Sequence, residues 1–160
     1  MEPVGVLTGA RIRPIIIGVI VDYLSTAVSG TVYVILFSMK EGLKNGNSSE
    51  ETIQRILTSP ESLLILGLIG VFCTVLGGYI AGRVAKELEV KHGTLVGVGS
   101  LVLTTLEGII SGQSTPYPQW YGIMGYLVTI PAGALGGYIA QRQRELRAAH
   151  RLPGGTRVER

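Results

Sequence analysis

The chain has 160 residues, of which 46% are hydrophobic and only 16% are charged, with a formal net charge of +3. Charge is both scarce and clustered, so the sequence leaves no room for a sizeable soluble part. The single cysteine, Cys73, excludes an intrachain disulfide and a cysteine-based metal site. Between the clusters lie four apolar stretches. Each is long enough to cross about 30 Å of hydrocarbon, which takes roughly 20 helical residues.

The four stretches are expected to span the membrane at residues 15–37, 62–84, 95–112 and 121–140. Backbone polar groups in lipid must be satisfied within each segment, and no alternating ten-residue pattern indicates a barrel. Each span is therefore predicted to be a helix. The predicted fold class is all-α, a polytopic membrane protein with one membrane domain over residues 1–160.

The first span also resembles a cleaved signal peptide. Arg11 and Arg13 precede its apolar run, and residues 27–29 form a small-residue cleavage sequence. Against cleavage, Asp22 interrupts the run, and apolar residues continue as far as Phe37. A spanning helix is the favoured interpretation.

A short amphipathic helix is predicted at about residues 49–58, on the outer side between the first two spans. Ser48 and Glu51 have the spacing of a capping box, and apolar residues follow at helical spacing. A disordered polar loop is the alternative for so short a segment. Ser59 and Pro60 are expected to open the second span as cap and first-turn proline.

The distribution of lysine and arginine predicts the orientation, because cytoplasmic loops hold the excess of these residues. Of the 14 basic residues, two lie in the N-terminal arm, three between spans two and three, and six in the tail. The first connection has Lys40, Lys44 and Arg55, offset by four glutamates, and the third connection has none. Both termini are therefore predicted to be cytoplasmic, in a multi-pass protein of the cell membrane.

The basic C-terminal tail, residues 141–160, is predicted to continue span four as a helix to about Arg151. Residues 153–155, Pro-Gly-Gly, then break the helix. A polybasic helix beside a membrane attracts anionic lipids by about 1 kcal/mol per basic residue. The predicted partner is therefore the lipid bilayer, including anionic lipids. Nucleic acid is disfavoured because neither interleaved aromatic residues nor a recognised binding fold accompanies the arginines.

An eight-residue motif occurs twice, at the ends of spans two and four. Residues 76–83 and 135–142 are identical at seven of eight positions. Both copies run from the outer to the inner side in the predicted topology. The chain therefore resembles two tandem helical hairpins, a parallel repeat.

Small residues four apart in both copies are predicted to let another helix backbone approach closely in lipid. A substrate-binding role for these glycines is the competing interpretation. Each copy also places a tyrosine and an arginine four apart, at the predicted inner interface. The predicted packing residues are Gly77, Gly78, Gly82, Gly133, Gly136 and Gly137. The predicted interface anchors are Tyr79, Arg83, Tyr138 and Arg142, with Trp120 in the outer aromatic belt.

The run from Gly77 to Arg83, followed by His92 and Gly93 and by a glycine-rich span, resembles small four-helix prokaryotic integral membrane proteins of uncharacterised function. The resemblance covers mainly residues 62–112. It implies a bacterial or archaeal cytoplasmic membrane. It transfers no catalytic or ligand residue to this chain.

Asp22 and Glu107 have no packing explanation. A charge at the centre of a spanning helix costs about 2.5 to 3.5 kcal/mol on insertion scales, so it normally faces a partner or a cavity, or is neutralised. Asp22 lies roughly 10 Å and Glu107 roughly 20 Å from the predicted cytoplasmic side, so the two are not expected to bond directly. Arg13 is the nearest candidate cation for Asp22. Hydroxyls extend a polar stripe from each carboxyl: Ser25, Thr26 and Ser29 from Asp22, and Ser100, Thr104 and Ser111 from Glu107.

The sequence bears on three classes of function. The favoured one is a non-enzymatic membrane protein that works by association, as a homo-oligomer or an accessory subunit. The alternative is a small proton- or cation-coupled transporter or channel with Asp22 and Glu107 on its path. An enzyme is disfavoured because no nucleophile, base and orienting group can be assembled. No cofactor or metal is predicted, since His92 and His150 lack ligand spacing.

Overall fold

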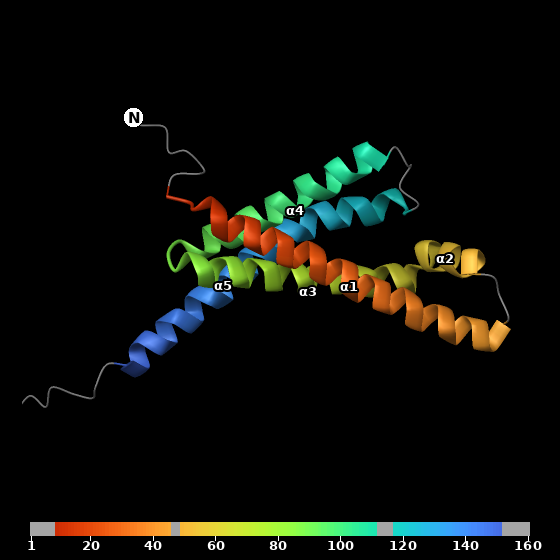
Figure 1. The fold of residues 1–160 in the computed structure, drawn as a ribbon, viewed down its shortest axis with the longest axis horizontal. Helices are drawn as coiled ribbons and strands as arrows, with labels where there is room; N and C mark the ends of the chain where they lie inside the picture. Colours follow the sequence, from red (N-terminus) through yellow and green to blue (C-terminus); the bar gives the residue numbers. More distant parts are fainter. Residues whose placement is uncertain (1–8, 46–48, 112–116, 152–160) are drawn as a thin grey trace, which may run out of the picture.

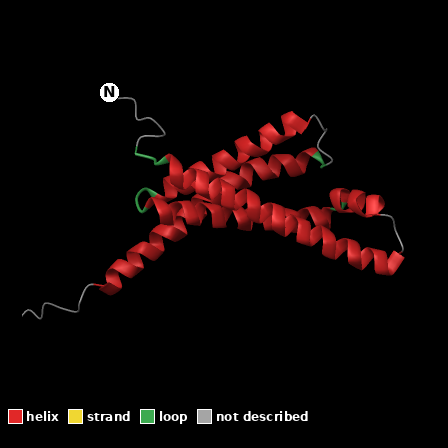
Figure 2. Ribbon diagram, viewed as in Figure 1, coloured by secondary structure: helices red, strands yellow, loops and turns green. Residues whose placement is uncertain are grey.

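The computed structural model describes residues 9–45, 49–111 and 117–151. These ranges contain five helices and no strand (Figure 2). The helices are α1 (Ile12–Asn45), α2 (Ser49–Thr58), α3 (Pro60–Ala85), α4 (Glu89–Ser111) and α5 (Gln119–Arg151). All except α2 are long and apolar enough to cross a membrane. The predicted all-α fold with four spanning helices is therefore confirmed.

The spanning segments are longer than the apolar stretches that predicted them. They run Ile12–Lys40, Pro60–Ala85, Glu89–Ile110 and Gln119–His150. The chain turns from α3 into α4 within three residues, so α4 begins at Glu89, six residues before the predicted start. Lys86 closes α3 in the left-handed region, with a φ of 62°, and its N–H donates to the Gly82 carbonyl at 3.1 Å. Helices extend past the apolar stretch because polar side chains at their ends can reach water.

The short helix α2 occupies the predicted stretch, with Thr52 and Ile56 buried on one face. Its predicted cap, Ser48, lies outside the described residues. Ser59 and Pro60 open α3 as expected, but the Ser59 side chain makes no capping hydrogen bond. The backbone joins the two helices instead, because the Ser59 N–H donates to the Arg55 carbonyl at 2.8 Å.

The four long helices form a bundle that is closed at one end and open at the other (Figure 1). The closed end consists of the start of α1, the α3–α4 turn and the later turns of α5. We call it the basic end, because Arg83, Lys86 and Arg144 lie there. At the opposite end, which carries α2, the α4–α5 pair diverges from the α1–α3 pair (Figure 1).

The outer surface of the bundle is apolar. Large side chains such as Leu68, Phe72 and Ile109 are exposed on the spanning helices. The interior, in contrast, contains small residues and a few polar groups. This arrangement suits lipid as the surrounding solvent, because lipid does not drive large apolar side chains inward.

Glycines of the repeated motif bring α3 against two neighbouring helices. Gly78 lies on the backbone of Gly133 in α5, where an added Cβ would sit 3.0 Å from the Gly133 carbonyl carbon. Gly77 lies on α1, where an added Cβ would sit 2.6 Å from the Gly18 carbonyl oxygen. Both contacts are between backbones, so neither leaves space for a side chain.

The second copy of the motif faces different helices. Gly136, equivalent to Gly77, lies on α3, where an added Cβ would be 2.6 Å from the Tyr79 nitrogen. Gly137, equivalent to Gly78, lies on α4, where an added Cβ would be 2.9 Å from the Glu89 carbonyl carbon. At Gly82, an added Cβ would be 2.9 Å from the Cβ of Ala140 in α5. The motif thus links α1, α3, α5 and α4 in turn, within one chain.

Candidate functional site

Asp22 lies in the first third of α1, and only 4% of it is exposed. Its position depends on the glycine contact between α1 and α3, one turn earlier on α1. At Gly77 an added Cβ would be 2.9 Å from the Asp22 Cβ. The two backbones are therefore close enough for the Asp22 carboxyl group to reach side chains on α3.

Hydroxyl groups from three helices surround the Asp22 carboxylate. Thr74 of α3 donates to Oδ1 at 3.1 Å and lies 3.3 Å from Oδ2. Ser100 of α4 donates to Oδ2 at 2.5 Å, and Thr26 of α1 to Oδ1 at 3.4 Å. Hydroxyls can satisfy a carboxylate as donors, but they are neutral and cannot balance its charge. The exposed Arg13, the cation suggested by the sequence, is not among these partners.

A cavity of about 650 Å³ opens beside this carboxylate, between the diverging helix pairs. Its lining residues fall within 22–26 of α1, 60–74 of α3, 100–104 of α4 and 120–129 of α5. Those segments lie at the level of Asp22 or on its α2 side. The cavity therefore extends from Asp22 toward the open end, and the glycine contacts close the bundle on the basic side.

The cavity walls are mostly apolar and become aromatic near the start of α5. Leu63 and Met124 are among the apolar lining residues. Trp120, predicted as a membrane-interface residue, also lines the cavity, and its ring meets that of Tyr121 edge-on with centroids 5.9 Å apart. Tyr121 reaches toward α3, where an added Cβ at Gly67 would lie 3.6 Å from its ring. Two aromatic side chains and one buried carboxylate thus line a single cavity.

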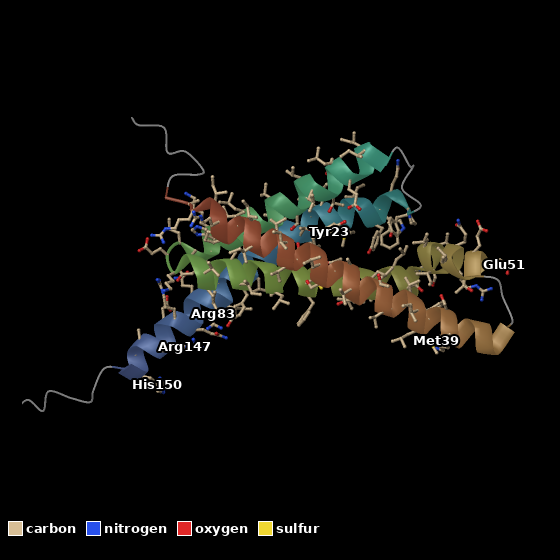
Figure 3. All side chains as sticks on the ribbon, in the orientation of Figure 1. Tyr23, Met39, Glu51, Arg83, Arg147 and His150 are labelled. Carbon is tan, nitrogen blue, oxygen red and sulfur yellow. The ribbon has the colours of Figure 1, made fainter. Side chains whose placement is uncertain are left out.

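Glu107, the second predicted carboxylate, has different surroundings. It is exposed on α4 and does not line the cavity. Its Oε1 accepts a hydrogen bond from the Tyr23 hydroxyl at 3.3 Å. Tyr23 itself lines the cavity, at the point where the helix pairs diverge (Figure 3). The two predicted path residues therefore do not share one site.

The two tyrosine–arginine pairs of the repeat also differ. Arg83 donates to the Tyr79 hydroxyl at 3.2 Å, and its guanidinium carbon lies 5.7 Å from the Tyr79 ring centroid. In the second copy, Tyr138 is exposed and Arg142 instead lies 3.6 Å from Glu145. Only the first copy therefore forms the interaction that its spacing permits.

His92 connects two helices at the basic end. It is 1% exposed, and its Nε2 lies 2.9 Å from the Arg11 backbone N–H, which donates to it. Its Nδ1 lies 3.0 Å from the Leu88 carbonyl, so Nδ1 carries the proton in this arrangement. His92 thereby ties the start of α1 to α4, and both ring nitrogens are occupied. Among the described residues, no three His, Cys, Asp or Glu side chains gather as metal ligands would.

Sequence reasoning did not identify Thr74 or assign Ser100 to Asp22. Thr74 lies one turn before the first glycine pair of the repeat, and this position was the sequence feature that could have identified it. Comparison of the chain with known protein families, with curated proteins and with solved structures found no match. The function must therefore be argued from the geometry around Asp22.

Proposed function

We propose that this chain is a non-enzymatic membrane protein that binds a cation at Asp22, as one step of cation- or proton-coupled transport. The observation that carries the proposal is a buried carboxylate, held by three neutral hydroxyls, beside a cavity. A charge in such surroundings is costly unless a proton or another cation joins it. Of the two functions that the sequence left open, the cavity favours transport over association.

The cavity also favours one class of cation. Its walls are mostly apolar, and they include the aromatic side chains of Trp120 and Tyr121. Cations are attracted to the faces of such rings. Charge attraction to Asp22 is strengthened because apolar walls lower the local dielectric constant. A lipophilic monovalent organic cation matches these features better than a hydrated metal ion, which requires several oxygen ligands.

The distribution of basic residues supports an orientation for this site. The basic end would face the cytoplasm, and both termini would lie on that side. The cavity would then open toward the outside. A protein in this state would receive a cation from outside and hold it at Asp22, with the glycine contacts closing the inner half.

Cysteine labelling tests this orientation. In a Cys73→Ala background, Glu50→Cys and Gln119→Cys are expected to react with an impermeant maleimide in intact cells. His150→Cys is expected to react only after the cells are permeabilised. All three positions are exposed, whereas Cys73 is buried. Labelling of position 150 in intact cells would contradict the proposed orientation and place the C-terminal side outside the cell.

Cation binding can be followed through Trp120, the only tryptophan of the chain and a lining residue of the cavity. Adding tetraphenylphosphonium to the protein in detergent is expected to change the tryptophan fluorescence, and this change is expected to reach a plateau as the concentration of the cation rises. Tetraphenylborate has the same shape and the opposite charge, so it provides the matched control and is expected to bind far more weakly. Equal responses to both ions would show partition into an apolar surface and would contradict a cation site.

Association remains the second candidate, supported by small residues on the outside of the bundle. At Gly30 and Gly122 an added Cβ would meet no described atom within 4 Å. Small residues exposed on spanning helices allow close contact with another helix. A second copy of this chain or a subunit of a larger complex could occupy those faces, and cation binding at Asp22 would be compatible with either.

A further inference from the structure

A second cleft lies at the basic end, away from the Asp22 cavity. Its volume is about 660 Å³, and it separates the end of α3 from the later turns of α5. Figure 3 labels Arg83 and Arg147 in this region, where α5 leaves the bundle. The charged and polar lining residues are Arg83, Lys86, Glu89, Gln143, Arg144 and Arg147.

Helix packing places four cations around this cleft. Arg83 lies in the last turn of α3 and Lys86 directly follows that helix, while Arg144 and Arg147 are three residues apart on α5. The close contact at Gly82, which lies against α5, brings the two pairs together. Arg144 and Arg147 share one face of α5, as residues three apart on a helix do, and both pairs line the cleft.

The cleft has a surplus of positive charge. Its only carboxylate, Glu89, is 3% exposed and lies 2.9 Å from the Nε of Arg144. Arg144 also donates to the Lys86 carbonyl. Within the described part of the chain, none of Arg83, Lys86 and Arg147 has an acidic partner. Three of the four cations are thus left without a balancing charge in the cleft.

One wall of the cleft is held in place by hydrogen bonds. The Tyr79 hydroxyl donates to Oε1 of Gln143 at 2.7 Å, which links α3 to α5. Arg83 donates to the same hydroxyl, so its guanidinium group is positioned before any ligand arrives. A positioned guanidinium loses less conformational freedom when it binds an anion.

We propose that this cleft binds the phosphate group of an anionic phospholipid. It lies at the end of the spanning helices, where headgroups of the adjacent leaflet are found. Arginine forms forked hydrogen bonds with phosphate oxygens, and lysine adds a point charge. The cleft is large enough for a phosphate with its glycerol headgroup. This cleft is a defined site, in contrast to general attraction of lipid to the basic tail, and lipid binding here does not depend on cation binding at Asp22.

Thermal unfolding in detergent tests the site, because a ligand that binds only the folded protein raises the unfolding midpoint. The native protein would be titrated with phosphatidylglycerol, phosphatidylcholine and inorganic phosphate. Phosphatidylglycerol is expected to raise the midpoint with saturation, and phosphatidylcholine is not. Arg147→Gln and Lys86→Gln are each expected to need about tenfold more phosphatidylglycerol, the loss of one charge-assisted contact.

Arg142→Gln is the matched control. It removes the same charge from the same helix, but Arg142 is exposed, lies beside Glu145 and does not line the cleft. Its phosphatidylglycerol dependence is expected to stay within about twofold of the native value. If Arg142→Gln and Arg147→Gln weaken phosphatidylglycerol binding equally, the lipid is attracted by the overall charge of the helix, and the proposal of a defined site is wrong. Saturation by inorganic phosphate at the same concentration would identify a free anion as the ligand and overturn the lipid assignment.

Discussion

Replacing Asp22 by asparagine is expected to abolish saturable tetraphenylphosphonium binding while leaving the protein folded. Asparagine keeps the shape of aspartate but carries no charge, and its amide offers an oxygen that can accept from Ser100 and an NH2 group that can donate to the Thr74 hydroxyl oxygen. Attraction between unit charges about 4 Å apart is roughly 4 kcal/mol at an effective dielectric constant of 20. The affinity should therefore fall by at least about a hundredfold. The measurement is the fluorescence titration of Trp120, with the unfolding midpoint as the test of folding.

Two further variants separate a charge effect from a structural one. Glu107→Gln removes a carboxylate outside the cavity, so its tetraphenylphosphonium affinity is expected to stay within about twofold of the native value. Asp22→Leu removes the hydrogen bonds from Thr74 and Ser100 that link α1 to α3 and α4, and is expected to cost about 1 to 2 kcal/mol of stability. If Asp22→Asn leaves the tetraphenylphosphonium affinity unchanged, Asp22 is only an interhelical hydrogen-bonding group. Association would then be the favoured function.

Transport itself is measured in vesicles. With an imposed pH gradient and a fluorescent pH reporter inside, the native protein is expected to give a cation-dependent signal that Asp22→Asn lacks. If the protein binds the cation but produces no flux, the cation site is supported and the proposed transport is contradicted.

Adding a single methyl group at Gly78 is expected to destabilise the protein by about 1 to 3 kcal/mol. In Gly78→Ala the new Cβ would meet the Gly133 backbone, with the carbonyl carbon at 3.0 Å and Cα at 3.1 Å. Backbone cannot rotate away as a side chain can, so α3 and α5 must separate. Alanine is the better helix former by about 1 kcal/mol, and the clash must outweigh that gain. Unfolding of the detergent-solubilised protein by added SDS measures the difference.

Gly122→Ala is the matched control for Gly78→Ala. Gly122 lies on α5, one of the two helices of that contact, and no described atom lies within 4 Å of an added Cβ there. The substitution is expected to leave stability unchanged or slightly raised, since only helix propensity changes. Gly136→Ala should behave like Gly78→Ala, because its added Cβ would lie 3.0 Å from the Gly78 carbonyl carbon. Equal midpoints for the three variants would mean that the repeated glycines are not packing residues.

The sequence by itself determined the elements of this protein. Long apolar stretches specify spanning helices because backbone groups in lipid must bond within their own segment. That requirement is local, so it could be read from 62–84 or 121–140 without knowing the neighbours. The short α2 was likewise predicted from its spacing of apolar residues. The repeated glycines marked where helices come close, because small residues act through their size alone.

Only the tertiary structure decided which helices those glycines join and what surrounds Asp22. Its partners Thr74 and Ser100 are 52 and 78 residues away along the chain. Every span carries hydroxyls, and lipid exerts no hydrophobic force that would specify which face of a helix turns inward. The rotation of each helix therefore follows from backbone contacts between glycines, and those contacts bring the hydroxyls to one carboxylate. The same contacts close the basic end and let the helix pairs diverge beyond it, which is why hydropathy located the helices but not the cavity.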